Sequence, residues 1–214
     1  ARSAQGMTCY IYNGVPYIAC GFLNYIEIHN IENGELVKKI ESTLFNHCND
    51  VTYYDGKLFI ADTTNKYLVT LNLSDYAISQ TVELSDSFLH GVEYNSGIFY
   101  VLTLSPEKIT LYNTDFEKIS SYNVNYPSNI NAKQGIYCDT NYLYLISGRA
   151  IRNDNKEYYN MVSCYNKFNG KFIKNVYLPY GMEIEAISYY NNSHYFYYNC
   201  YSKCGFIAKG SLYF

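Results

Sequence analysis

The stretch His90-Gly91-Val92-Glu93-Tyr94-Asn95-Ser96-Gly97-Ile98-Phe99-Tyr100-Val101-Leu102 contains a short apolar strand, a polar turn and a second strand rich in aromatic residues. Its opening of a polar residue, a small or acidic residue and an apolar residue recurs at Gln5, Asn49, Gln134 and Glu185. The five starts are about 41 to 51 residues apart. That spacing is typical of the four-stranded blade of a β-propeller.

The rest of each repeat keeps the same order of strands and turns. Third strands alternate polar and apolar residues, as in Ile26-Glu27-Ile28 and Ile109-Thr110-Leu111-Tyr112, and period-two alternation favours strand over helix. Fourth strands are predicted at Val37 to Ile40, Ile78 to Leu84, Ile119 to Val124 and Phe172 to Leu178. The sequence therefore predicts an all-β fold, a five-bladed β-propeller of four-stranded antiparallel blades with almost no helix. A jelly roll or lectin sandwich would leave the repeat unexplained.

The fifth repeat stops at Phe214 before any fourth strand, and only four residues precede Gln5. We therefore expect an incomplete last blade, in a chain that is part of a longer protein. The alternative is a trimmed terminus in a chain that is otherwise complete. The predicted organisation is a single domain over residues 1–214, with blades at about 5–48, 49–89, 90–133, 134–184 and 185–214.

Composition excludes several classes of function. A chain of 214 residues with 48% hydrophobic content can bury a substantial core. Its net charge of −3, with both signs interspersed, predicts no nucleic-acid binding. No apolar run approaches the length that would insert in a membrane.

The seven cysteines are odd in number and scattered. This favours free thiols and assembly in a reducing cytoplasm. Cys200-x-x-x-Cys204 is the only close pair. A zinc site would need more ligands than this pair and His194 provide, so we expect no metal and no cofactor.

Tyrosine is unusually frequent, with 28 residues against no tryptophan. Most of these side chains are expected to fill the core between blades. Tyrosine is also enriched in recognition surfaces, and together with abundant asparagine it would suit sugar binding. The same composition also follows from an AT-rich genome, so both explanations stay open.

The leading residues of the five repeats form the first candidate site. Innermost strands begin there, so these side chains should form a polar ring at one mouth of the central channel, with His47, Asp50 and Glu183 nearby. The ring would suit a hydroxyl-rich ligand, or it would cap strand ends and bond neighbouring backbone. Its five members are Gln5, Asn49, His90, Gln134 and Glu185.

The second candidate site is the extended turn of the fourth repeat, Arg149 to Tyr158. Arg149, Arg152 and Lys156 make it the most basic part of an acidic chain, and arginine suits phosphate. Insertions on a repeat scaffold are often binding loops. A solvated hairpin, with Asp154 and Glu157 offsetting the charge, is the alternative.

Catalysis would require carboxylates in the central cavity, where glycosidases place their acid and their nucleophile or base. The available carboxylates are Asp50, Glu93, Glu183 and Glu185. Neither long substrate-binding loops nor a known hydrolase or phosphate-loop motif accompanies them. We therefore expect no enzyme activity.

Repeats start with Gln-Gly-apolar, turns are of the Asn/Asp-Gly type, and residues 183–187 read Glu-x-Glu-Ala-Ile. In these three features the chain resembles five-bladed propellers of phage tail and receptor-binding proteins, from phages of Gram-positive bacteria. The resemblance covers the whole chain. It implies a virion-tail protein, assembled in the host cytoplasm, that binds a cell-surface glycan or a teichoic-acid-like polymer. It also implies a homotrimer formed through regions outside this chain. The chain itself shows no trimerisation stem.

The sequence thus predicts a non-catalytic recognition or adhesion module that binds carbohydrate. The alternatives are a glycoside hydrolase acting on polysaccharide and a propeller that serves as a protein-binding scaffold.

Overall fold

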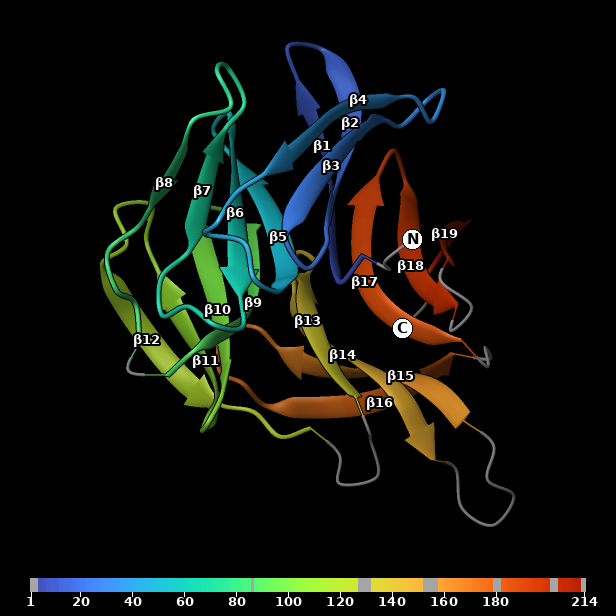
Figure 1. Cartoon of the computed structure of the whole chain (residues 1–214). Coiled ribbons are helices and arrows are strands. Elements are labelled where there is room, and N and C mark those ends of the chain that lie inside the picture. The colour runs from blue at the N-terminus through green and yellow to red at the C-terminus, as the bar shows by residue number, and fades with distance from the viewer. Residues whose placement is uncertain are drawn as a thin grey trace.

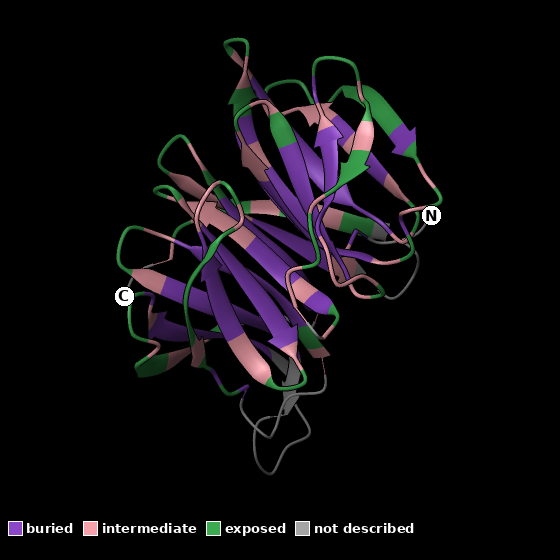
Figure 2. Ribbon diagram, turned by 90° about the vertical axis from the view of Figure 1, so that its left-hand side faces the viewer, coloured by how far each residue is buried: buried purple, intermediate pink, exposed green. Residues whose placement is uncertain are grey.

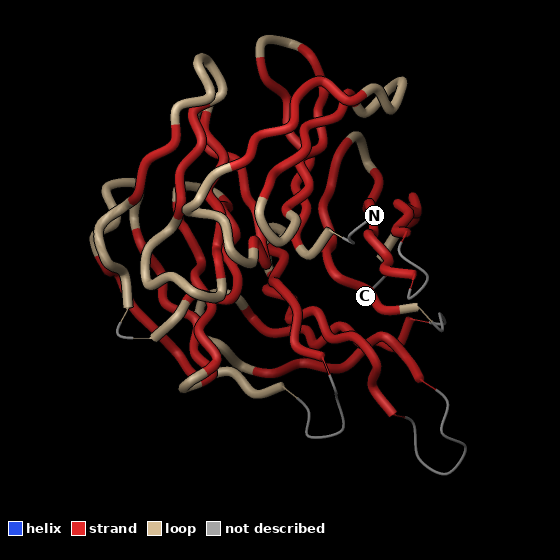
Figure 3. The backbone as a smooth tube through the Cα atoms, in the orientation of Figure 1, coloured by secondary structure: helices blue, strands red, loops and turns tan. Residues whose placement is uncertain are grey.

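The computed structural model describes residues 4–85, 87–126, 132–151, 158–178, 182–200 and 204–212. These residues form nineteen strands joined by turns and loops, and none of them is helical (Figures 1 and 3). The described part of the chain accordingly offers no helix that could cross a membrane.

The strands form five antiparallel sheets, each built from strands consecutive in the chain. The first sheet contains β1 (Gly6–Tyr12), β2 (Val15–Gly21), β3 (Tyr25–Asn30) and β4 (Leu36–Glu41). The second contains β5 (Cys48–Tyr54), β6 (Lys57–Asp62), β7 (Val69–Asn72) and β8 (Ile78–Gln80). The third contains β9 (Leu89–Asn95), β10 (Ile98–Leu104), β11 (Glu107–Tyr112) and β12 (Lys118–Asn123).

The fourth sheet contains β13 (Ala132–Cys138), β14 (Tyr142–Ile151), β15 (Tyr158–Asn166) and β16 (Phe172–Leu178). The fifth contains β17 (Glu183–Tyr190), β18 (Ser193–Cys200) and β19 (Cys204–Gly210). Within the described residues it has three strands, where each of the other sheets has four.

The first strand of each sheet lies innermost and contacts the first strands of both neighbouring sheets. The contacts run from β1 to β5, β9, β13 and β17, and β17 closes the ring on β1. The sheets are therefore the blades of a five-bladed β-propeller (Figure 1). The prediction of an all-β, five-bladed propeller with an incomplete last blade is confirmed.

The turns between first and second strands are tight because their residues tolerate positive φ. Two consecutive residues have positive φ at Asn13-Gly14, Asp55-Gly56, Ser96-Gly97 and Asn191-Asn192. Two such residues in a two-residue loop match the twist of a hairpin. The predicted turns therefore form at these four positions. In the fourth blade, an Asx turn takes this role, since Asp139 Oδ1 accepts from the amide of Asn141.

One strand prediction is wrong in its extent. The fourth strand of blade two ends at Gln80, whereas the sequence predicted that it continues to Leu84. The amide of Thr81 still donates to the Leu68 carbonyl at 3.0 Å. The Leu68 amide, however, donates to the Thr81 hydroxyl at 3.0 Å. A side chain has therefore replaced the backbone acceptor, and the ladder ends there.

Buried residues lie mainly on the inner strands of the blades, and exposed residues lie on the loops and outer strands (Figure 2). Several tyrosines belong to this core, and Tyr100 and Tyr144 are almost fully buried. For these two, the prediction that tyrosines fill the core is confirmed. Among the described side chains, the cysteines that are free thiols are Cys9, Cys20, Cys48, Cys138 and Cys164.

Candidate functional site

The five leading residues lie where innermost strands begin, and their side chains bond mainly to neighbouring parts of the protein. The Asn49 amide donates to the His90 carbonyl at 2.7 Å. The His90 ring Nε2 lies 2.8 Å from the Lys133 carbonyl. Each of these bonds joins one blade to the next, because the partners belong to blades two, three and four. They form the strand-capping arrangement that the sequence left as one of two alternatives.

The other three members make similar contacts. Gln5 Oε1 lies 3.0 Å from the His47 ring, and Gln134 donates to Glu183 Oε1 at 3.2 Å. The Glu185 carboxylate accepts from the Asn199 side chain at 3.0 Å. Asn49, Gln134 and Glu185 are also buried. Gln134 is thus bonded to the next blade, and Glu185 is bonded to Asn199 of its own blade.

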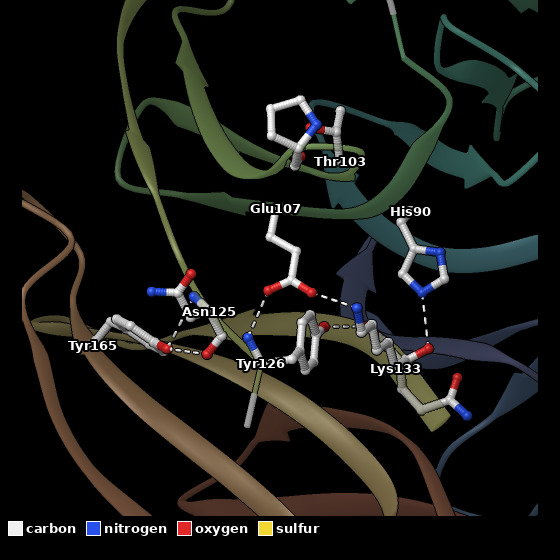
Figure 4. A network of polar contacts seen from close by, with 9 residues as sticks. His90, Thr103, Glu107, Asn125, Tyr126, Lys133 and Tyr165 are labelled. Carbon is white, nitrogen blue, oxygen red and sulfur yellow. Dashed lines mark hydrogen bonds and ion pairs between the residues drawn. The ribbon is translucent and has the colours of Figure 1, made fainter. Parts of the chain in front are cut away.

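A polar network extends from this mouth between blades three and four (Figure 4). The Glu107 carboxylate accepts from the Tyr126 amide at 2.7 Å and pairs with the Lys133 ammonium group. The Tyr126 hydroxyl donates to the Gln134 carbonyl at 2.7 Å. Glu107 of blade three thus binds both Tyr126, which follows β12, and Lys133 of blade four.

The basic turn of the fourth blade falls outside the described part of the chain. Arg152 and Lys156 are outside the described residues, and Arg149 lies in β14 with its side chain not described. The predicted phosphate site there stays a prediction.

One step deeper along the channel, the second residue of each repeat start faces the axis. Four of the blades have a small residue at this step, and blade two has Asp50. Asp50 Oδ2 accepts from the amides of Val92 at 3.1 Å and Ile136 at 3.0 Å. Its Oδ1 accepts from its own neighbour Val51 at 3.0 Å. One carboxyl group therefore joins blades two, three and four at the centre of the ring.

The small residues opposite Asp50 make room for it. A Cβ atom added to Gly135 would lie 2.5 Å from Asp50 Oδ2. A Cβ atom added to Gly6 would lie 2.5 Å from the Asp50 Cα atom. These distances are shorter than any normal van der Waals contact. Gly135 and Gly6 therefore pack directly against Asp50 at this step, where a larger residue would not fit.

Beyond Asp50, the channel widens into a pocket of about 550 Å³ that opens at the opposite mouth. All five blades line its inner part with the fourth residue of each repeat start. Four of these residues carry hydroxyl groups and one carries a carboxyl group. The five residues are Thr8, Thr52, Glu93, Tyr137 and Ser188.

Two of the hydroxyl groups are fixed by backbone amides from the next blade. Thr52 Oγ1 accepts from the Tyr94 amide at 3.0 Å, and Ser188 Oγ accepts from the Cys9 amide at 2.7 Å. Each hydroxyl oxygen accepts from an amide, which leaves its proton for another acceptor. The Thr52 hydroxyl hydrogen-bonds the Glu93 carboxyl group, and the Ser188 hydroxyl bonds the Cys9 thiol. The inner wall of the pocket is therefore polar, with hydroxyl groups held in fixed positions.

Glu93 is the carboxyl group of this pocket. Protein surrounds it on all sides except toward the pocket, from which it stays partly accessible. Burial raises the pKa of Glu93 well above its usual value, and the nearby Asp50 raises it further. A hydrogen bond with Thr52 acts in the opposite direction. Burial therefore favours the neutral acid form of Glu93, in which the group both donates and accepts hydrogen bonds.

The rim of the pocket is aromatic and polar. Tyr53, Tyr94 and Tyr189 lie there together with Asp139 and His194. Burial lowers the pKa of His194 and so favours the neutral ring. Burial raises the pKa of the Cys9 thiol to about 12, and a thiol with that pKa is a poor nucleophile. The pocket therefore holds few groups that are charged at neutral pH.

Asp50 should make stability depend on pH. Burial raises its pKa to about 7 in the folded protein, from an ordinary value of 3.8, although its three amide donors act in the opposite direction. The neutral form is thus favoured by folding, so this contribution is complete below about pH 4 and is lost as the pH rises through about 7. We expect the stability advantage of wild type over Asp50→Asn to fall by an amount on the order of 4 kcal/mol between those limits. Denaturant unfolding of both proteins at pH 4, 5.5 and 7 measures it, and a constant or growing advantage would contradict this pKa.

The predicted ring consists of the first residue of each repeat start, and it stays a prediction. The pocket lies on the other side of Asp50 and is lined by the fourth residue of each start. The signal was present, because aligning the five starts places hydroxyl or carboxyl groups at that step in every blade. Among the described residues, no group of three or more His, Cys, Asp or Glu side chains could hold a metal ion.

No protein-family model matches the chain, and no curated protein matches it in sequence. Solved structures do match in fold. The glutaminyl cyclase of Myxococcus xanthus aligns with a TM-score of 0.67 at 12% identity, over 98% of this chain and 91% of that one. The WD40 repeats of RRP9 align with a TM-score of 0.59 at 10% identity, over 96% and 76% of the two chains. A chain of a nidogen/laminin complex aligns with a TM-score of 0.60 at 12% identity, over 92% and 72%.

At these identities the similarity shows the propeller fold alone. It supports the five-bladed part of the resemblance that the sequence suggested, and it does not link the chain to phage tail proteins. The matching structures include one named as an enzyme and one named as WD40 repeats. The function must therefore be argued from the pocket.

Proposed function

We propose that the protein is a non-catalytic recognition module that binds one sugar unit of a cell-surface carbohydrate in the pocket beyond Asp50. The observation that carries the proposal is the ring of four hydroxyl groups and one carboxyl group, that of Glu93, contributed by all five blades. Burial raises the pKa of this carboxyl group and so favours its neutral form. A pocket of about 550 Å³ is within the usual size range of small-ligand sites.

The chemistry of the pocket fits an uncharged, hydroxyl-rich ligand. Thr8, Thr52 and Ser188 present hydroxyl groups to the pocket, and Glu93 presents a carboxyl group, and these are groups that hydrogen-bond ligand hydroxyls. The tyrosine rings at the rim have apolar faces that pack against the C–H groups of a sugar, and their hydroxyls bond its edges. A terminal sugar of a glycan or of a teichoic-acid-like polymer is the unit that would enter.

A glycoside hydrolase is the second candidate, because two carboxyl groups of raised pKa, Asp50 and Glu93, lie close together. Such enzymes need two carboxyl groups that flank the scissile bond. Of these two, only Glu93 lines the pocket, since Asp50 lies beneath it with its oxygens bonded to three amides. Asp139 also lines the pocket, at its rim, but its carboxylate already accepts from the Asn141 and Tyr142 amides and from the Tyr144 hydroxyl. This geometry favours binding without cleavage.

The test is a glycan and cell-wall-polymer array that scores both binding and cleavage. We expect binding without turnover and, for the strongest sugar, an affinity about 5- to 10-fold lower for Glu93→Ala, the effect of one hydrogen bond. Glu93→Gln keeps a neutral donor and acceptor, so its affinity should stay within about threefold of wild type.

Gln5→Ala serves as the matched control, because Gln5 lies at the opposite mouth. It should leave sugar affinity unchanged. If Gln5→Ala weakened binding while Glu93→Ala did not, the ring of leading residues would be the site instead. Cleavage by wild type that Glu93→Gln abolishes would establish the hydrolase. Silence across the array would exclude both candidates.

A further inference from the structure

The outer edge of the fifth blade differs from the other four. Its third strand, β19, has no fourth strand beside it among the described residues. Ile207 of β19 pairs with Tyr197 of the second strand. At the same step of the ladder, the complete blades one, three and four have Ile26, Ile109 and Val162. These three are fully buried, whereas Ile207 is 41% exposed.

In these three complete blades, a residue of the fourth strand pairs with the residue equivalent to Ile207. Ile26 pairs with Ile40, Ile109 pairs with Tyr122, and Val162 pairs with Val176. In each blade, the fourth strand therefore places a β-branched or aromatic side chain opposite the buried residue. Such cross-strand pairs are the main stabilising unit of a sheet.

A groove of about 380 Å³ lies between blades five and one, beside the open edge. Ile207 and Tyr195 line it from blade five, and Ile18, Phe22 and Ile31 line it from blade one. Glu27 and His29, whose side chains lie 3.2 Å apart, also line the groove. The exposed face of Ile207 thus continues into a mainly apolar groove between the blades.

Both ends of the described chain pack elsewhere. Ala4 is buried between blades five and one, and its amide donates to the Tyr197 hydroxyl at 3.1 Å. Leu212 donates to the His194 ring at 3.3 Å and packs against the core shared by blades four and five. Neither of these residues covers the β19 edge.

Lys209 of β19 indicates which residue a strand paired with β19 would place opposite it. At this step the complete blades have Ile28, Leu111 and Cys164, which face Lys38, Ser120 and Lys174. Lys209 replaces those uncharged residues, and like charges directly opposite each other destabilise a strand pair. A strand that pairs with β19 should therefore have serine or an acidic residue there.

We propose that the β19 edge and its groove bind an extended peptide of a partner protein as an antiparallel fourth strand. The peptide carries Ile, Val or Tyr opposite Ile207 and, two residues earlier, Glu or Ser opposite Lys209. Strand addition of this kind gains affinity from backbone hydrogen bonds and specificity from alternate side chains. The site is separate from the sugar pocket, so it does not depend on the proposed function.

The probe is a labelled peptide with the sequence of this protein's own β12 and the residue after it, Lys-Ile-Ser-Ser-Tyr-Asn-Val. Its tyrosine would lie opposite Ile207, and its first serine opposite Lys209. Versions with Glu or Lys in place of that serine complete the set. We expect wild type to bind Glu, Ser and Lys versions in decreasing order, with steps of about 1.5- to 5-fold.

Two variants locate the site. Ile207→Asp should lower peptide affinity at least tenfold, and thermal unfolding would verify that it is folded. Lys209→Glu should reverse the order, so that the Lys peptide binds best. The control, Ile173→Asp, alters an exposed residue on the outer edge of a complete blade and should change nothing. The proposal is overturned if wild type binds none of the peptides, if Ile207→Asp binds as wild type does, or if Lys209→Glu leaves the order unchanged.

Discussion

Replacing Asp50 with alanine at pH 5 is expected to lower the free energy of unfolding by about 3–5 kcal/mol. The variant leaves the amides of Val51, Val92 and Ile136 without the acceptor that they share. Each buried donor that loses its partner costs about 1–3 kcal/mol, and water entering the space would recover part of that cost. The loss should be large because the three amides belong to three different blades.

Urea denaturation followed by circular dichroism measures this loss. Asp115→Ala is the matched control, because Asp115 is an exposed aspartate in an outer turn, and it should change stability by less than about 0.5 kcal/mol. A loss below about 1 kcal/mol for Asp50→Ala would show that Asp50 does not hold the centre of the propeller together.

Replacing Gly135 with alanine is expected to cost about 2–3 kcal/mol, although it adds a single methyl group. That methyl would lie 2.5 Å from Asp50 Oδ2. The carboxyl group cannot move aside without losing its bonds to Val92 and Ile136. Gly210→Ala, whose nearest neighbour would be the Phe196 ring at 3.3 Å, is the milder control.

A double-mutant cycle isolates the contact between these two positions. In the Asp50→Ala background the space beside Gly135 is empty, so Gly135→Ala should cost little there. We expect a coupling free energy of about 1–3 kcal/mol. Additive losses would mean that Gly135 is required for some reason other than room for Asp50.

The blade architecture could be predicted from the sequence because its signals are local. Asn13-Gly14 and Asp55-Gly56 specify hairpins through their own backbone preferences. The alternation in Ile26-Glu27-Ile28 specifies a strand with two different faces. Repetition of these signals in all five units then fixed the number of blades. The sequence did not predict where β8 ends, because that end depends on the hydrogen bond between the Thr81 hydroxyl and the Leu68 amide.

The site was harder to predict, because a polar residue beside the channel can serve the protein or a ligand. Asn49 and Glu93 both lie in innermost strands. The Asn49 amide is bonded to the next blade, whereas Glu93 lines an open pocket. The sequence places both near the axis but does not show which hydrogen bonds they form. Asp50 separates the two groups, and its role depends on amides about 40 and 90 residues further along the chain.

A crystal structure of the protein bound to the sugar that ranks highest on the array tests the proposed binding site most directly. We expect the sugar in the pocket beyond Asp50, with a ligand oxygen within hydrogen-bond distance of the Glu93 carboxyl group and its ring against the rim tyrosines. A sugar bound instead at the mouth formed by Gln5, Asn49 and His90, with the pocket empty, would contradict it.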